Sequence, residues 1–182
     1  ALAVIAAALL DAGRPIIVIA RDGPLRVLGA ARAPATTCGF SPDAIGRLLA
    51  TLPCEAVVLV DDLDGLEQQT PAVAEQLAAL VSGADDTVEP AGPAGPSLGR
   101  APVVVASAQT ARAAMAYRGA LGALRATRRG LLLGLAEPGS GEVLGVGLEW
   151  VIDPAHPHAP GRGARQHGRD LVPVQVLDPD LP

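Results

Sequence analysis

Short apolar runs alternate with longer segments of helical character along most of the chain. Three of these runs are rich in Val and Ile and lack a polar residue at every second position, which is typical of strands buried on both faces of a parallel sheet. The three predicted strands cover residues 15–20, 56–60 and 102–107. Parallel strands need a crossover connection, so helices are expected between them.

Capping residues mark the boundaries of these helices. Ser41 and Thr70 each precede a proline, the arrangement favoured at the N-cap and first position of a helix, and Gly13 suits the residue after a helix end. The predicted helices cover residues 1–12, 41–52, 70–81 and 110–127. Helices between buried strands at this spacing predict an α/β fold with a right-handed parallel sheet, in a single domain over residues 1–182.

The remaining segments have less regular patterns. Residues 21–40 are predicted to be irregular apart from a short strand near 26–28, and short strands are predicted at 130–134 and 172–176. Two stretches rich in Gly and Pro are predicted loops: a flexible one over 83–101, and another over 154–171 before the last strand.

Composition narrows the class of protein. The chain has 182 residues, of which 49% are hydrophobic but only 2% aromatic, so Ala, Leu and Val must build the core. All 14 basic residues are Arg, and the net charge of −5 argues against a broad nucleic-acid surface while leaving room for a local Arg patch. No apolar run reaches the roughly 18–20 residues of a membrane span. Two isolated cysteines, Cys38 and Cys54, fit a reducing, cytoplasmic location.

The candidate chemistry begins where the second predicted strand ends. Asp61 and Asp62 directly follow the apolar run 56–60, and parallel α/β sheets bind ligands at the carboxyl ends of their strands. An acid pair there is costly to desolvate, and Mg²⁺ with a phosphate is the usual compensation. This is the pattern of a Walker B motif. An ordinary acidic turn that caps the next helix explains the same residues equally well.

The order of elements and several local strings resemble one family. The order is that of a RecA-like ATPase core entered just after its P-loop, and residues 1–15 resemble the segment that follows the Gly-Lys/Arg-Ser-Thr of such a loop. The other strings are Tyr117-Arg118-Gly119, Arg128-Arg129-Gly130-Leu131-Leu132-Leu133-Gly134, and Pro160-Gly161-Arg162-Gly163 ahead of Pro173-Val174-Gln175-Val176. Together they look like the C-terminal ATPase domain of FtsK/SpoIIIE-type proteins. The likeness is greatest to the often degenerate last domain of actinobacterial members, including the EccC/EssC-type ATPases of type VII secretion.

This resemblance implies a RecA-like parallel sheet of the ASCE P-loop NTPase class, flanked by helices and lacking the first strand and P-loop. It implies ATP and Mg²⁺ as cofactors in the full-length parent, with Asp61 in the metal shell and Asp62 as the catalytic acid that orients the attacking water. In active members that acid is typically Glu, which is one methylene longer. Ser107 and Gln109 fall near the polar sensor of the bound nucleotide. Active translocases read Ala-Thr-Gln-Arg-Pro there, whereas residues 106–110 read Ala-Ser-Ala-Gln-Thr.

Three functions remain open from the sequence. The first is an ATP-binding module of a ring ATPase that translocates DNA or secreted protein, weakly active or inactive itself. The second is a degenerate regulatory or partner-binding module of a type VII secretion ATPase. The third, a Rossmann-like binding domain, is disfavoured because no glycine-rich strand-to-helix turn is present. The first two predict that the three buried strands are parallel neighbours, with Asp61 and Ser107 at one edge of the sheet. They also predict an unpaired edge between the strands at 102–107 and 130–134.

Overall fold

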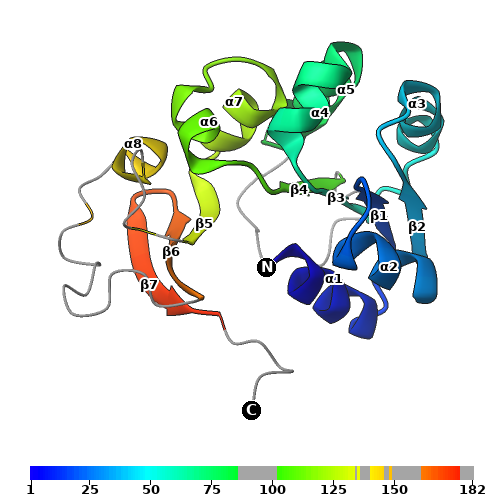
Figure 1. The fold of residues 1–182 in the computed structure, drawn as a ribbon, viewed down its shortest axis with the longest axis horizontal. Helices are drawn as coiled ribbons and strands as arrows, with labels where there is room; N and C mark the ends of the chain where they lie inside the picture. The colour runs from blue at the N-terminus through cyan, green and yellow to red at the C-terminus, as the bar shows by residue number, and fades with distance from the viewer. Residues whose placement is uncertain (86–101, 134, 136–139, 146–147, 149–160, 177–182) are drawn as a thin grey trace, which may run out of the picture. The chain divides into compact units, whose positions relative to one another are not determined.

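The computed structural model describes residues 1–85, 102–133, 135, 140–145, 148 and 161–176 (Figure 1). The chain divides into two compact units, residues 1–108 and 109–182, and each is considered by itself. The predicted flexible loop over 83–101 lies outside the described residues from position 86 onward, and residues 83–85 form the end of a helix. Within the described parts of both units, no helix is long and apolar enough to cross a membrane.

The first unit contains a four-stranded parallel sheet in the order β2-β1-β3-β4 (Figure 1). Its strands are β1 (Ile16–Ile19), β2 (Ala35–Cys38), β3 (Val57–Val60) and β4 (Val103–Ala106). In register, Ile16 lies opposite Val57, which lies opposite Val103. The predicted parallel adjacency of the three buried strands is therefore confirmed, and β2 is a fourth parallel strand inside the segment expected to be irregular.

Five helices cover this sheet: α1 (Leu2–Asp11), α2 (Pro24–Ala31), α3 (Pro42–Ala50), α4 (Leu63–Gln69) and α5 (Pro71–Asp85). The helices predicted at 1–12, 41–52 and 70–81 are confirmed, with α5 running further than expected. The strand predicted near 26–28 is wrong, because those residues belong to α2. The cause is Pro24, which occupies the first turn of this helix, where its missing N–H has no partner to lose.

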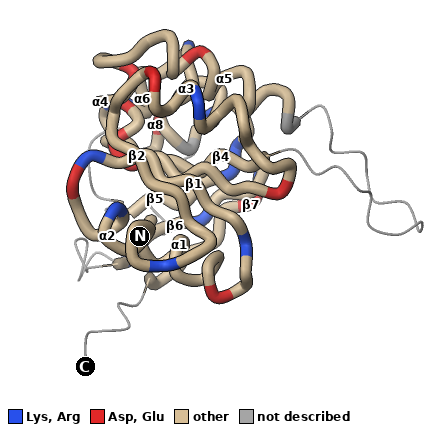
Figure 2. The backbone as a smooth tube through the Cα atoms, turned by 90° about the vertical axis from the view of Figure 1, so that its right-hand side faces the viewer, with Lys and Arg blue, Asp and Glu red and all other residues tan. Residues whose placement is uncertain are grey.

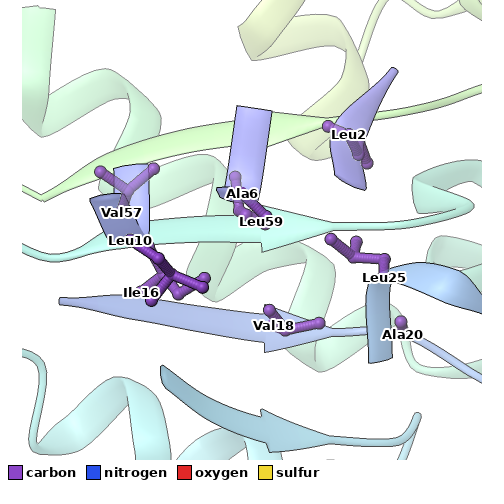
Figure 3. Packing of buried hydrophobic residues seen from close by; sticks show 9 residues of the cluster. All are labelled: Leu2, Ala6, Leu10, Ile16, Val18, Ala20, Leu25, Val57 and Leu59. Atoms are coloured by element: carbon purple, nitrogen blue, oxygen red, sulfur yellow. The ribbon is translucent and has the colours of Figure 1, made fainter. Parts of the chain in front are cut away.

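The core on one face of the sheet joins α1 and α2 to β1 and β3 (Figure 3). Leu2, Ala6 and Leu10 recur at intervals of four along α1, so they share one helix face, and all three are buried. They pack against alternate strand residues, including Ile16, Val18, Val57 and Leu59. Because every residue of β1 and β3 is buried, the intervening residues must be covered on the other face. This double burial explains why both strands are continuously apolar.

The chain reverses its direction across the sheet between β1 and β3. It runs from β1 outward to β2, and then returns past β1 to β3. Since parallel crossovers are right-handed, the helices before and after this reversal lie on opposite faces. In doubly wound sheets, ligands bind at the carboxyl ends of the two strands that flank such a reversal, which here are β1 and β3.

The second unit is built differently, around the antiparallel sheet β5-β6-β7. Its elements are α6 (Thr110–Met115), α7 (Gly119–Ala126), β5 (Arg129–Leu133), α8 (Ser140–Leu144), β6 (Arg162–His167) and β7 (Asp170–Gln175). The strands predicted at 130–134 and 172–176 exist, and they belong to this antiparallel sheet, so β5 is not a neighbour of β4. A turn of only two residues, Gly168 and Arg169, joins β6 to β7. Such a short link permits only antiparallel pairing.

The loop predicted over 154–171 is also corrected where it is described. Residues 154–160 lie outside the described residues, whereas β6 and the start of β7 occupy 162–171. Gly163 and Ala164 are buried in β6, and a side chain at Gly163 would collide with the carbonyl oxygen of Leu132 on β5. The small residues that looked like loop composition therefore permit close approach of two strands.

Arg125 of α7 connects this helix to α6 and α8 through hydrogen bonds. The helix predicted over 110–127 is divided into α6 and α7, and the Arg125 guanidinium donates hydrogen bonds to the carbonyl oxygens of Ala114 at 2.7 Å and Glu142 at 2.8 Å. These acceptors belong to the end of α6 and to α8. The guanidinium also lies over the Tyr117 ring, 5.4 Å from its centroid. A cation near a helix C-terminus is favourable, because carbonyl groups there lack intrahelical partners.

Candidate functional site

Asp61 and Ser107 meet at the carboxyl edge of the parallel sheet. The backbone continues the strand ladder on both sides, since the Asp61 N–H donates to the carbonyl oxygen of Ile19 at 2.9 Å and the Ser107 N–H to that of Val60 at 2.9 Å. The Ser107 hydroxyl donates to Asp61 Oδ1 at 2.6 Å. Such a short bond is expected when the acceptor is an ionised carboxylate. The predicted placement of both residues at one edge is confirmed.

Ser107 also fixes the turn that leads from β3 into α4. Its hydroxyl oxygen accepts a hydrogen bond from the Asp62 N–H at 3.0 Å, and its carbonyl oxygen accepts one from the Leu63 N–H at 2.8 Å. The hydroxyl donor is therefore used on Asp61, and one acceptor position is used on Asp62. A single half-buried serine thus joins the ends of two adjacent strands.

Asp62 has a left-handed backbone conformation, with φ 58° and ψ 56°. Asp tolerates this conformation better than most residues. Asp62 is the N-cap of α4, and its Oδ1 accepts a hydrogen bond from the Gly65 N–H at 3.2 Å. Its carboxylate is already engaged in the helix-capping role that the sequence allowed as an alternative to catalysis.

Arg21 also lies at this edge and is not among the predicted site residues. Its guanidinium lies 3.8 Å from Asp62 Oδ2 and 4.8 Å from the centroid of the Phe40 ring. Arg21 follows β1 and Asp62 follows β3, so the ion pair spans the point where the strand order reverses. Both side chains are about half exposed, and such a pair is worth little in stability. The sequence signal was an Arg placed directly after a buried strand, at the same register as the acids.

Cys38 ends β2 and lies further along the same carboxyl edge. It is buried, and burial raises the pKa of its thiol above the ordinary value, while the nearby Arg26 guanidinium acts in the opposite direction. Arg26 donates hydrogen bonds to the carbonyl oxygen of Arg21 at 3.1 Å and to Asp22 Oδ1 at 3.4 Å. Arg26 therefore supports the loop that carries Arg21.

Gln109 belongs to the second unit. It is exposed and precedes α6 as its N-cap, where its carbonyl oxygen accepts a hydrogen bond from the Ala113 N–H at 2.9 Å. Of the four predicted site residues, Asp61, Asp62 and Ser107 thus share one site within the first unit. Gln109 is described only within its own unit.

The side chains at this edge can supply only part of the ligands that a metal ion needs. Among the residues that the structure describes, no group of three or more His, Cys, Asp or Glu side chains could hold a metal ion. Mg²⁺ commonly binds through one or two carboxylates, completed by waters and substrate phosphates. Asp61 therefore fits a Mg²⁺ ion that arrives with a phosphate, and does not fit a protein-only metal centre.

No protein-family model matches the chain, and neither a curated protein nor a solved structure matches it. The geometry around Asp61 therefore carries the functional inference.

Proposed function

We propose that this chain is an ATP-binding module of an FtsK/SpoIIIE-type ring ATPase, and that it is weakly active or inactive itself. The observation that carries the proposal is the hydrogen bond from the Ser107 hydroxyl to Asp61 Oδ1 at 2.6 Å, across the carboxyl ends of two adjacent parallel strands. An acid at the end of one strand and a small polar residue at the end of the next are the arrangement that the sequence resemblance implies. The strand order is compatible with a RecA-like sheet, and other doubly wound sheets also accommodate it.

Asp61 is the proposed metal ligand. One of its carboxylate oxygens is held by Ser107, and the other has no hydrogen-bond partner among the described residues. An oriented carboxylate with one open oxygen suits a hard cation such as Mg²⁺. When bound, the metal would neutralise charge on the phosphates of ATP, and Ser107 would keep the carboxylate in place.

Asp62 supports the part of the proposal that concerns weak activity. A residue that positions an attacking water needs a carboxylate free to accept a hydrogen bond from that water. Here the Asp62 carboxylate caps α4 through Gly65 and faces Arg21. Phosphoryl transfer depends largely on positioning and on charge stabilisation, to which a P-loop lysine contributes. Every basic residue of this chain is Arg, so it supplies no such lysine.

The resemblance alone supports the wider setting. We propose a cytoplasmic module within a homo-oligomeric ring, in a parent that can be membrane-anchored and that moves DNA or secreted protein. Because the Asp62 carboxylate already caps α4, it favours the alternative of a degenerate regulatory or partner-binding module of a type VII secretion ATPase. The reversal between β1 and β3, flanked by Arg21 and Asp62, is the observation that keeps a Rossmann-like binding domain as a third candidate.

Paramagnetic broadening of the amide NMR signals by Mn²⁺ in the presence of ATP tests the site. We expect selective broadening at Asp61, Asp62 and Ser107, and loss of that broadening in Asp61→Asn. A carboxylate of this kind should bind weakly, and a ligand present at its own dissociation constant adds only about 0.4 kcal/mol of stability. No clear ATP-dependent thermal shift is therefore expected. Broadening that avoids this edge, or that is unchanged in Asp61→Asn, would contradict the proposed site.

Steady-state turnover tests the proposed lack of activity separately. We expect the 182-residue chain to release no phosphate from ATP above the background rate. Turnover that Asp61→Asn abolishes would show that Asp62 can leave its capping position, and the chain would then be an active motor module.

A further inference from the structure

Arg21 lies just beyond the carboxyl end of β1 and is contacted from both neighbouring strands. Its guanidinium lies over the ring of Phe40, which follows β2, at 4.8 Å from the centroid. It is also 3.8 Å from Oδ2 of Asp62, which follows β3. Ile19 is opposite Val60 in register, so Arg21 and Asp62 are each two positions beyond the paired strands. The guanidinium is therefore held from two sides at the point where the strand order reverses.

These contacts orient the Arg21 guanidinium but leave its donors unused. Attraction to an aromatic face consumes none of the N–H groups of a guanidinium. The distance of 3.8 Å to Asp62 is too long for a hydrogen bond, and among the described residues the guanidinium donates to no acceptor. About half of the Arg21 side chain is exposed. Arg21 thus presents an oriented, charged set of donors to the solvent.

Arg26 of α2 supports the two loops that position Arg21. Its guanidinium donates a hydrogen bond to the carbonyl oxygen of Arg21 at 3.1 Å. Gly39, directly before Phe40, lies beside the same guanidinium, since a Cβ built onto Gly39 would be 3.4 Å from Arg26 Nη1. The loop after β1 and the loop after β2 therefore share a contact. The positions of Arg21 and Phe40 are set together.

The acidic side chains around Arg21 decide which ligand it can hold. Asp22 contacts Arg26 at 3.4 Å, Asp62 faces Arg21, and Asp61 keeps one carboxylate oxygen without a partner among the described residues. Acidic and basic residues are also interspersed along the rest of the described backbone (Figure 2). Because carboxylates outnumber guanidinium groups at this edge, a free anion is repelled. A phosphate that arrives with a divalent cation meets a more favourable balance, since the cation suits Asp61.

We propose that Arg21 binds a phosphate group of the metal-bound nucleotide, with Phe40 as its positioning residue. Guanidinium groups pair with phosphate oxygens through two parallel hydrogen bonds. Arg21 and Asp61 follow neighbouring strands, about 4.8 Å apart, that flank the reversal of strand order, where parallel sheets bind ligands. The inference rests on the proposed ATP site, and it assigns the phosphate a cation in a chain whose basic residues are all Arg.

Binding of phosphate at Arg21 and of metal at Asp61 should be coupled. A cation at Asp61 offsets the repulsion between the phosphate and the aspartates, and a coupling of this kind is reciprocal. ATP should therefore bind the parent about tenfold more weakly when a chelator removes Mg²⁺. Equal affinity for ATP with and without Mg²⁺ would contradict the coupling.

Amide chemical-shift titration of the full chain with ATP and Mg²⁺ measures the contribution of Arg21. Arg21→Gln removes the charge and should weaken binding about tenfold, as expected for the loss of a charged hydrogen-bonded pair. Arg21→Lys keeps the charge but not the paired donors, so it should bind about threefold more weakly than the parent. Adenosine, which has no phosphate, should give the same response in the parent and in Arg21→Gln.

Phe40→Leu tests the positioning role. Leu keeps an apolar side chain but has no aromatic face, so binding of ATP with Mg²⁺ should weaken about threefold. In the Arg21→Gln background there is no cation to position, and Phe40→Leu should cause no further loss. If Phe40 only stabilised the fold, the same factor would be lost in both backgrounds, and the positioning role would be wrong.

Arg47→Gln is the matched control. Arg47 is exposed in the last turn of α3, far along the helix from the loop that leaves β2, so this variant makes the same change of charge elsewhere. It should bind ATP as the parent does. Equal affinities of Arg21→Gln and Arg47→Gln, with Mn²⁺ broadening at Asp61 intact, would overturn this inference and leave the ATP site standing. Absence of that broadening in the parent would overturn the ATP site and this inference together.

Discussion

The Asp62 carboxylate lies directly against the backbone of Gly65. Oδ1 accepts the Gly65 N–H at 3.2 Å, and a Cβ built onto Gly65 would lie 2.7 Å from Asp62 Cγ. The glycine therefore provides the space in which the cap is made. Asp62 and Gly65 act as a pair, so a change at either position should alter the effect of a change at the other.

Gly65→Ala should destabilise the protein by about 1 kcal/mol, because the new methyl group displaces the capping carboxylate. The matched control is Gly46→Ala in α3, where an added Cβ meets nothing within 4 Å. That variant should gain about 0.5–1 kcal/mol from helix propensity alone. Urea unfolding followed by circular dichroism measures both. Equal effects at the two glycines would contradict the pairing.

The contact between Asp62 and Gly65 predicts that the effect of Gly65→Ala on the free energy of unfolding changes sign when Asp62 is replaced by Ala. In an Asp62→Ala background there is no carboxylate to displace, so Gly65→Ala should stabilise by about 0.5–1 kcal/mol. Asp62→Ala itself should lose about 1–2 kcal/mol, since it removes the cap and leaves a left-handed residue without a side chain that favours that conformation. Asp62→Asn keeps an oxygen acceptor and tolerates the same backbone, so it should be nearly neutral. Additive effects would show that the contact carries no energy.

The parallel sheet could be predicted because a strand that is buried on both faces has a continuous run of apolar residues. β3 reads Val-Val-Leu-Val and all four residues are buried, so no helical or alternating pattern competes with a buried strand. β2 reads Ala-Thr-Thr-Cys at the sheet edge, where one side has no neighbouring strand among the described residues. Because β2 is only partly buried, its sequence has no continuous apolar run, and the strand could not be predicted.

The candidate site could be located from the sequence, but the role of its second acid could not. Asp61 and Asp62 are adjacent acids, yet one faces Ser107 from β4 and the other turns back to cap α4. That difference depends on a backbone conformation and on a partner 46 positions away from Asp61, which no local pattern encodes. Arg21 was missed for the same reason, because its contact with Asp62 exists only after β1 and β3 pair.

Ser107→Ala should lower the free energy of unfolding by about 1–2 kcal/mol. It removes a hydrogen bond to a charged acceptor and leaves the Asp62 N–H without its partner. Ser41→Ala is the matched control, because Ser41 precedes α3 without a side-chain capping bond. The control should change stability by less than about 0.5 kcal/mol. Similar losses in the two variants, measured by urea unfolding, would contradict the bridging role of Ser107.

Arg125→Met should loosen the second unit locally. Met retains the apolar stem, but the hydrogen bonds to the carbonyl oxygens of Ala114 and Glu142 are lost, at a cost of about 1–3 kcal/mol. Amide hydrogen exchange should speed up in α6 and α8, while β1 and β3 of the first unit stay protected. Arg112→Met is the control, since Arg112 is exposed on α6 and its side chain has no described partner. If amide hydrogen exchange in α6 is unchanged in Arg125→Met, the hydrogen bonds of Arg125 do not stabilise this helix.

Burial of the Cys38 thiol predicts that the folded protein loses stability at alkaline pH. Burial raises the pKa of its thiol in the folded protein above the ordinary value of 9.0, which the unfolded chain should show. The folded state therefore holds this proton more tightly. The stabilisation is fully present below pH 9 and is lost as the pH rises through the folded pKa, because the unfolded state releases the proton first.

Urea unfolding of the parent and of Cys38→Ala over the alkaline range measures this linkage. Cys38→Ala removes the titrating group, so the difference in stability between parent and variant should shrink above pH 9. The background is simple, because the chain has no Lys and a single Tyr. Cys54→Ser is the control: Cys54 is exposed, and the fall in stability should persist when it is replaced. A parent-to-Cys38→Ala difference that stays constant with pH would show that the buried thiol keeps its ordinary pKa.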